Sequence, residues 1–134
     1  MTSAYWCVLI AAYLPIVWTA LAKFSGWDFS EAANHAPRDF LDRLSGWRKR
    51  AHWAQLNGFE AFPPFAAAVI IAQLKHVPQA RLDTLAIAFV ILRVLHGILY
   101  LADRARWRSL IWFSAVGCVV ALFITSGINN GPVR

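Results

Sequence analysis

A polar stripe interrupts a long apolar stretch of this sequence and has the residue types of a binding site. Its members are spaced three, four and three residues apart: Arg50, Trp53, Asn57 and Glu60. On a helix this spacing places all four on one face. Hydrocarbon penalises amides and, more strongly, carboxylates, so we expect this face to meet protein or a water-filled pocket. His52 and Gln55 point elsewhere and are predicted to be interfacial or inter-subunit groups.

A second polar stripe follows in the next apolar stretch, where Arg93, His96 and Tyr100 are spaced three and four residues apart. At about 1.5 Å per residue, Asn57 and Glu60 lie about 10 and 15 Å below one membrane surface. The helix that carries the second stripe returns to that surface, with Tyr100 about 6 Å, His96 about 12 Å and Arg93 about 16 Å deep. We therefore expect Glu60 and Arg93 to pair. This pair could be purely structural and only fix the register of the two helices. The matching depths of Asn57, His96 and Tyr100 instead favour a binding site that is open to the cytoplasm.

The composition indicates an integral membrane protein. The 134 residues are 59% hydrophobic and include seven Trp, whereas soluble domains are about 45–50% apolar. The net charge of +6 comes from basic residues at the ends of apolar runs, which is typical of membrane topology rather than of a nucleic-acid partner. Cys7 and Cys118 lie in apolar stretches without metal-ligand spacing, so neither a disulfide framework nor a metal site is expected.

The predicted fold is all-α: one integral membrane domain over residues 1–134, a bundle of four transmembrane helices at about 4–23, 47–76, 79–102 and 107–126. About 20 residues span a hydrocarbon core of about 30 Å. The polar connection at 25–46 contains PRDFLDRL, which could form a short interfacial helix. As a whole, this connection could be a solvated loop or a lid over a pocket. Pro63-Pro64 is expected to bend the second helix.

The distribution of Lys and Arg predicts the orientation. The side of the first and third connections carries nine: Lys23, Arg38, Arg43, Arg48, Lys49, Arg50, Arg104, Arg106 and Arg108. The opposite side carries three: Lys75, Arg81 and Arg134. The positive-inside rule therefore places the basic connections, including the loop at 25–46, in the cytoplasm and both termini outside.

The two stripes resemble those of the MAPEG family, the membrane-associated proteins in eicosanoid and glutathione metabolism. The resemblance rests on the pattern N-x-x-E-x-x-P, here Asn57, Glu60 and Pro63. It also rests on the pattern R-x-x-H-x-x-x-Y of the second stripe and on the Arg108-Ser109 pair that opens the fourth helix. The PRDFL stretch is similar to that of bacterial members. The resemblance thus implies a bacterial inner membrane, with both termini in the periplasm.

The resemblance implies a homotrimer with a glutathione site between adjacent subunits, open to the cytoplasm. Members conjugate glutathione to lipophilic electrophiles, reduce lipid peroxides with it or isomerise an endoperoxide, and a few bind lipids without catalysis. By position, Asn57 and Glu60 would hold glutathione, with Glu60 facing its amino group. Arg93 would brace Glu60, and His96 and Tyr100 would line the site.

The resemblance also implies an arginine beside the sulfur. Arg108, or Arg106 if the shorter loop here shifts the register, would stabilise the thiolate, with Ser109 beside it. Arg38 or Lys23 could meet a glutathione carboxylate. A thiol with a pKa of about 8.5 is mostly protonated at neutral pH, and a nearby guanidinium lowers that pKa by about one to three units. The bilayer would supply the lipophilic substrate.

This chain departs from the family at two positions where its enzymes carry Arg, which here are Trp53 and Leu56. We expect a glutathione-dependent transferase or peroxidase, with a non-catalytic lipid- or thiol-binding protein as the alternative. A small multidrug-type transporter fits less well, since we expect its carboxylate in the first helix and free to titrate, whereas Arg93 should keep Glu60 ionised. A purely structural membrane subunit is the remaining reading.

Overall fold

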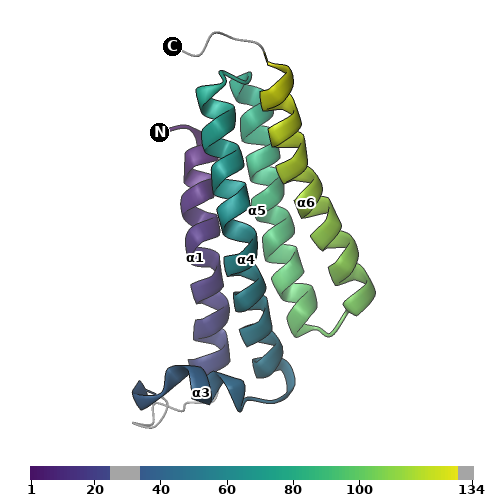
Figure 1. The fold of residues 1–134 in the computed structure, drawn as a ribbon. Coiled ribbons are helices and arrows are strands. Elements are labelled where there is room, and N and C mark those ends of the chain that lie inside the picture. The colour runs from purple at the N-terminus through teal and green to yellow at the C-terminus, as the bar shows by residue number, and fades with distance from the viewer. Residues whose placement is uncertain (25–33, 130–134) are drawn as a thin grey trace.

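The computed structural model describes residues 1–24 and 34–129, and its regular elements there are all helices. Four long helices form a bundle: α1 (Ser3–Phe24), α4 (Gly46–Leu74), α5 (Gln79–Leu101) and α6 (Ala105–Ile128). A short helix, α3 (Pro37–Asp42), crosses the end of the bundle opposite the N-terminus (Figure 1). The all-α prediction is confirmed, and the bounds of the long helices lie within two residues of those expected.

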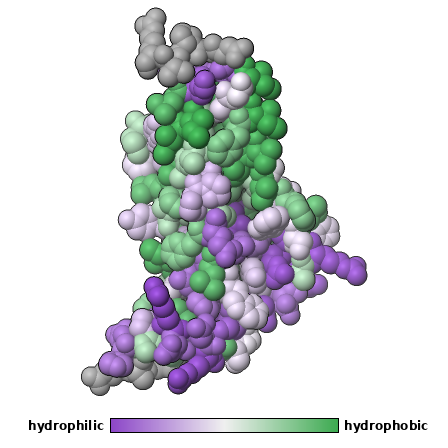
Figure 2. Space-filling model, in the orientation of Figure 1, coloured by the Kyte–Doolittle hydropathy of each residue, from purple (hydrophilic) through white to green (hydrophobic). Residues whose placement is uncertain are grey.

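Three of these helices, α1, α5 and α6, are long and apolar enough to cross a membrane. Helix α4 is the longest, with 29 residues, but it is not among these three; polar residues such as Asn57, Glu60 and Gln73 interrupt its apolar part. We expected four membrane-spanning helices; in the described part of the chain, three helices are long and apolar enough to be such spans. Figure 2 shows apolar side chains over much of the bundle and polar ones gathered at the end that carries α3.

Close contacts between helices hold the core of the bundle. The rings of Phe65 in α4 and Phe89 in α5 stack with centroids 3.9 Å apart. Gly97 in α5 lies against Trp18 in α1, where an added Cβ would collide with the indole ring. The missing side chain of Gly97 thus leaves room for the Trp18 ring between α1 and α5. Helix α4 continues as one helix through Pro63 and Pro64.

Two arginines at the start of α4 hold the ends of α1 and α5. Arg48 donates from Nε to the carbonyl oxygen of Ala22 (2.8 Å) and from Nη2 to that of Lys23 (3.1 Å). Arg50 donates to the carbonyl oxygen of Leu101 through Nη2 (3.0 Å) and Nε (3.2 Å). The last carbonyls of a helix have no partner within it and carry partial negative charge, so cations stabilise them.

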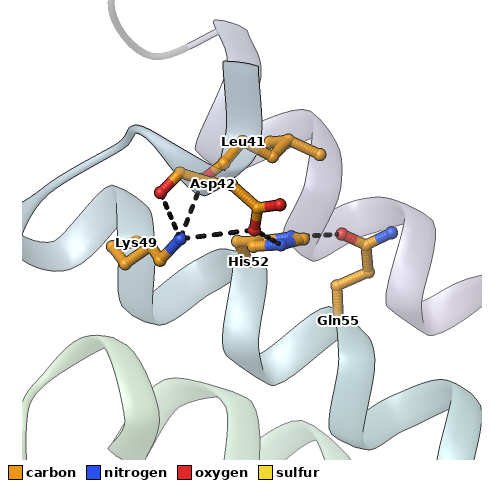
Figure 3. Close-up of polar contacts among 5 residues, drawn as sticks. All are labelled: Leu41, Asp42, Lys49, His52 and Gln55. Carbon is orange, nitrogen blue, oxygen red and sulfur yellow. Dashed lines mark hydrogen bonds and ion pairs between the residues drawn. The ribbon is translucent and has the colours of Figure 1, made fainter. Parts of the chain in front are cut away.

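Lys49 and His52 fasten α3 to α4 (Figure 3). Lys49 Nζ donates to the carbonyl oxygens of Asp42 (2.5 Å) and Leu41 (3.4 Å) and lies 3.5 Å from the Asp42 carboxylate. His52 Nε2 lies 3.4 Å from that carboxylate, and Nδ1 lies 3.0 Å from Gln55 Oε1. His52 is only 7% exposed. Within the chain, His52 therefore contacts α3, which folds back over this face of α4. The interfacial or inter-subunit roles expected for His52 and Gln55 stay a prediction.

The short helix expected in the first connection is present, and its apolar side packs against the bundle. Leu41 is buried with Ala22 of α1 and Ala51 of α4, and Phe40 and Leu44 pack at the edge of this cluster. This part of the connection is therefore a packed element rather than a solvated loop. Residues 25–33 of the same connection lie outside the described residues.

Replacing Lys49 with Met is expected to loosen α3. The change keeps an apolar stem of similar length but removes the ammonium group from the last carbonyls of a helix too short to be stable alone. We expect amide hydrogen exchange over residues 37–44 to become about tenfold faster, the loss of about one charged hydrogen bond. The control is Arg43→Met, which removes a charge from an exposed position next to the same helix end. Equal exchange in both variants would contradict this role of Lys49.

Candidate functional site

The deepest polar groups of the candidate site form a hydrogen-bonded link between α4 and α5. Arg93 Nη2 donates to Asn57 Oδ1 (2.8 Å), and Asn57 Nδ2 donates to Glu60 Oε2 (3.4 Å). Arg93 is 5% exposed, whereas Glu60 lies at the surface of the subunit. The link lets the Asn57 amide serve both ions, because one amide can accept from a guanidinium and donate to a carboxylate.

The expected direct ion pair between Glu60 and Arg93 is not formed. The ion pairs among the described residues join Asp42 to Lys49 and to His52. Asn57, one helical turn before Glu60 on the same face of α4, takes the position beside the Arg93 guanidinium. Arg93 therefore supports Glu60 through Asn57 rather than by contact.

An apolar pocket opens beside this link. It has a volume of about 210 Å³ and lies among α4, α5 and α6. Its polar wall is formed by Asn57, Glu60 and Arg93. The other lining residues are apolar or aromatic: Ala61, Pro64, Phe89, Trp112, Ala115, Val116 and Val119. A mainly apolar cavity with a few converging polar groups is the usual form of a small-molecule site.

A second, more polar pocket of about 320 Å³ adjoins the first. Its lining comes from all three helices: Asn57, His96, Tyr100, Arg108, Ser109, Trp112 and Phe113. Asn57 and His96 therefore line one pocket, in agreement with their predicted depths. Asn57 and Trp112 line both pockets, so the apolar and polar spaces are neighbours along the same groove.

Arg108 brings an uncompensated positive charge to the polar pocket. Its guanidinium carbon lies 4.2 Å from the centroid of the Tyr100 ring. No hydrogen bond or ion pair joins this guanidinium to a protein group in residues 1–24 and 34–129. The first turn of α6 also contains no acidic residue, although the start of a helix favours negative charge. This end of the pocket is therefore suited to an anionic group.

Two residues near Arg108, Ser109 and Tyr100, make contacts with other protein groups. Ser109 Oγ donates to the carbonyl oxygen of Ala105 in its own helix (3.1 Å). The His96 ring meets the Tyr100 ring edge-on, with centroids 5.4 Å apart and an interplanar angle of 75°. His96 is 2% exposed, and its buried Nδ1 has no hydrogen-bond partner in the part of the chain that the structure describes.

Five other candidates from the sequence do not line these two pockets. Arg50 is held by the Leu101 carbonyl, and Trp53 is 45% exposed. Arg38 on α3 and Arg106 at the start of α6 are exposed. Lys23 donates to Asn34 Oδ1 (2.8 Å). Of the first stripe, only Asn57 and Glu60 reach the pockets, because Arg50 is used to hold the end of α5.

The aromatic walls of the groove were not predicted from the sequence. Trp112 and Phe113 follow Arg108 by four and five residues, and Phe89 precedes Arg93 by four. Residues four apart share a helix face, so Trp112 and Phe89 could have been assigned to the site from their spacing. Among so many apolar residues, however, this spacing alone does not separate a pocket wall from a lipid-facing surface.

The fold and the groove define a helical membrane protein with a polar site among three helices. A model of the MAPEG family matches residues 3–128, nearly the whole chain. The chain therefore belongs to the MAPEG family, and the resemblance inferred from its two polar stripes is confirmed. No curated protein and no solved structure matches it.

The Asn57 link predicts a specific pattern of stabilities. Asn57→Leu leaves the buried Arg93 guanidinium without its hydrogen-bond acceptor, which should lower the free energy of unfolding by about 1.5–3 kcal/mol. Adding Arg93→Met removes the unpaired charge and should restore most of this loss. Both can be measured by denaturant titration in detergent micelles. Strictly additive losses in the double variant would show that the link does not operate.

Proposed function

We propose that this protein is a membrane-embedded glutathione-dependent transferase or peroxidase that acts on lipophilic electrophiles or lipid peroxides. The observation that carries the proposal is the pair of adjoining pockets, which share Asn57 and Trp112. One contains a guanidinium without a counter-ion, and the other is largely apolar. A polar thiol and a lipophilic partner need such neighbouring spaces to react. Membership of the MAPEG family agrees with this chemistry.

In this proposal Arg108 stabilises the sulfur of bound glutathione as a thiolate. A thiol is a weak nucleophile until it loses its proton, and a guanidinium within a few ångström favours the deprotonated form. The free N–H groups of Arg108 can donate to the sulfur anion. The lipophilic substrate would enter the apolar pocket from the bilayer, past Val116 and Val119.

Glu60 and Asn57 would hold the peptide part of glutathione, with the Glu60 carboxylate facing the amino group. Glu60 is exposed in the single subunit at a depth of about 15 Å. An exposed carboxylate at that depth is costly in hydrocarbon. We therefore propose a homotrimer in which an adjacent subunit covers the groove, with glutathione held between the two.

The proposed membrane arrangement places all four long helices across a bacterial inner membrane. Helix α4 runs alongside α1 and α5 (Figure 1), and its 29 residues extend about 44 Å. Its polar face would be covered by the adjacent subunit rather than by lipid. The basic end with α3 would lie in the cytoplasm and both termini in the periplasm.

A non-catalytic protein that binds a lipid or another thiol is the second candidate. It is favoured by the small number of free cations near the pockets, since Arg50 is occupied by a helix end and Trp53 carries no charge. In the proposed enzyme, where Arg108 lies at the sulfur, the two glutathione carboxylates would depend on Arg93 and on loop residues such as Arg38 or Lys23 of an adjacent subunit.

Calorimetry with glutathione on the detergent-purified protein tests the proposal. We expect saturable binding that is weakened at least about tenfold by Glu60→Gln, because that change removes the charge facing the ligand amino group. We expect Arg108→Ala to abolish the thiolate absorbance that appears on binding, since the sulfur then loses its cation. Turnover of a hydrophobic electrophile or peroxide should fall with the thiolate signal.

Arg106→Ala is the matched control, because it removes the same charge from an exposed position two residues away. It should leave both binding and thiolate absorbance close to the unsubstituted protein. Absence of binding at millimolar glutathione would contradict the enzyme. Binding without any thiolate signal or turnover would favour the non-catalytic protein.

A further inference from the structure

We propose that Tyr100 is a positioning residue, whose ring face holds the Arg108 guanidinium at the pocket while leaving its N–H donors and its charge available to a ligand. The inference deepens the proposed function and rests on it, because the anion that Arg108 would meet is the sulfur of glutathione. It assigns Tyr100 a role through Arg108 instead of through direct contact between its hydroxyl and the ligand.

The geometry at the start of α6 supports this role. The guanidinium carbon of Arg108 lies over the Tyr100 ring, 4.2 Å from its centroid, well within the range in which a cation is attracted to an aromatic face. A long, flexible side chain near a helix start would otherwise be free to extend into water. Among the described residues, no carboxylate pairs with Arg108.

A ring face and a carboxylate differ in how many N–H donors of a guanidinium they leave free for a ligand. A carboxylate would take two N–H donors of the guanidinium in a bidentate contact and neutralise its charge. A ring contacts the flat face, while the N–H groups point outward in the plane of the guanidinium. The contact with the ring face therefore fixes the position of Arg108 without consuming the groups that would bind a sulfur anion.

The Tyr100 ring and the helix end that carries it are each held by a neighbouring side chain. The buried His96 ring, one turn earlier in α5, meets the Tyr100 ring edge-on. The next residue, Leu101, has its carbonyl oxygen held by two donors of Arg50. His96 thus contacts the ring from within α5, and Arg50 at the start of α4 holds the end of α5 that carries it, so the position of Arg108 depends on both helices.

The two possible roles of Tyr100 are separated by two substitutions. Tyr100→Phe keeps the ring face and removes the hydroxyl, whereas Tyr100→Leu removes the ring and keeps an apolar side chain. With glutathione bound at saturation, we expect Tyr100→Phe to keep the thiolate fraction at neutral pH within about twofold of the unsubstituted protein. We expect Tyr100→Leu to lower it about threefold to tenfold, while glutathione affinity changes less. Thiolate absorbance followed against pH measures the first quantity, and calorimetry the second.

A loss of thiolate in Tyr100→Phe equal to that in Tyr100→Leu would assign the effect to the hydroxyl and overturn the proposal. An unchanged thiolate fraction in Tyr100→Leu would also overturn it. Lower affinity in Tyr100→Leu with a normal thiolate fraction once bound would show a merely structural role, and would overturn it as well.

A ligand-free measurement separates this inference from the glutathione proposal. In protein labelled with ¹⁵N-arginine, the Arg108 Nε–H resonance, assigned with Arg108→Lys, should show a ring-current shift in the unsubstituted protein. The shift should persist in Tyr100→Phe and disappear in Tyr100→Leu. If glutathione fails to bind at all, the thiol ligand is wrong, and this experiment alone then decides whether Tyr100 holds Arg108. A resonance that does not move in Tyr100→Leu would overturn the contact.

Discussion

The contact between the basic start of α4 and the carbonyl ends of its neighbours is the constraint on which the rest of the structure depends. Arg48, Lys49 and Arg50 are consecutive, and they bind the ends of α1, α3 and α5 respectively. Each contact places a cation at the negative end of a helix. Of the three, the Arg50 contact sets the offset between α4 and α5, and at this offset Asn57 reaches Arg93. The same cluster supplies the positive charge that orients a membrane protein.

The candidate site follows from that offset. The Asn57 amide joins a buried cation to an exposed carboxylate, so two ions are held within the groove without direct contact. Toward the basic end, Arg108 rests on a ring and keeps its charge. Away from it, the groove becomes apolar. The gradient from a free cation to an apolar wall matches the needs of a reaction between a polar thiol and a lipophilic molecule.

Helical spacing predicted which residues share a face, and depth along the helices predicted that Asn57 and His96 would line one pocket. Spacing could not predict which neighbour each face meets. Arg50 shares the stripe with Asn57, yet it binds the end of α5. His52 is covered because α3 folds back, a tertiary contact without a local signal. Likewise, the equal depths predicted for Glu60 and Arg93 did not indicate that the Asn57 amide would bind to both.

The most direct test of the proposed site is a structure of the protein in a lipid nanodisc at saturating glutathione. We expect a trimer with glutathione between subunits, its amino group at Glu60 and its sulfur beside the Arg108 guanidinium, which still rests on the Tyr100 ring. Glutathione bound away from these groups, or a groove filled by lipid under the same conditions, would contradict it.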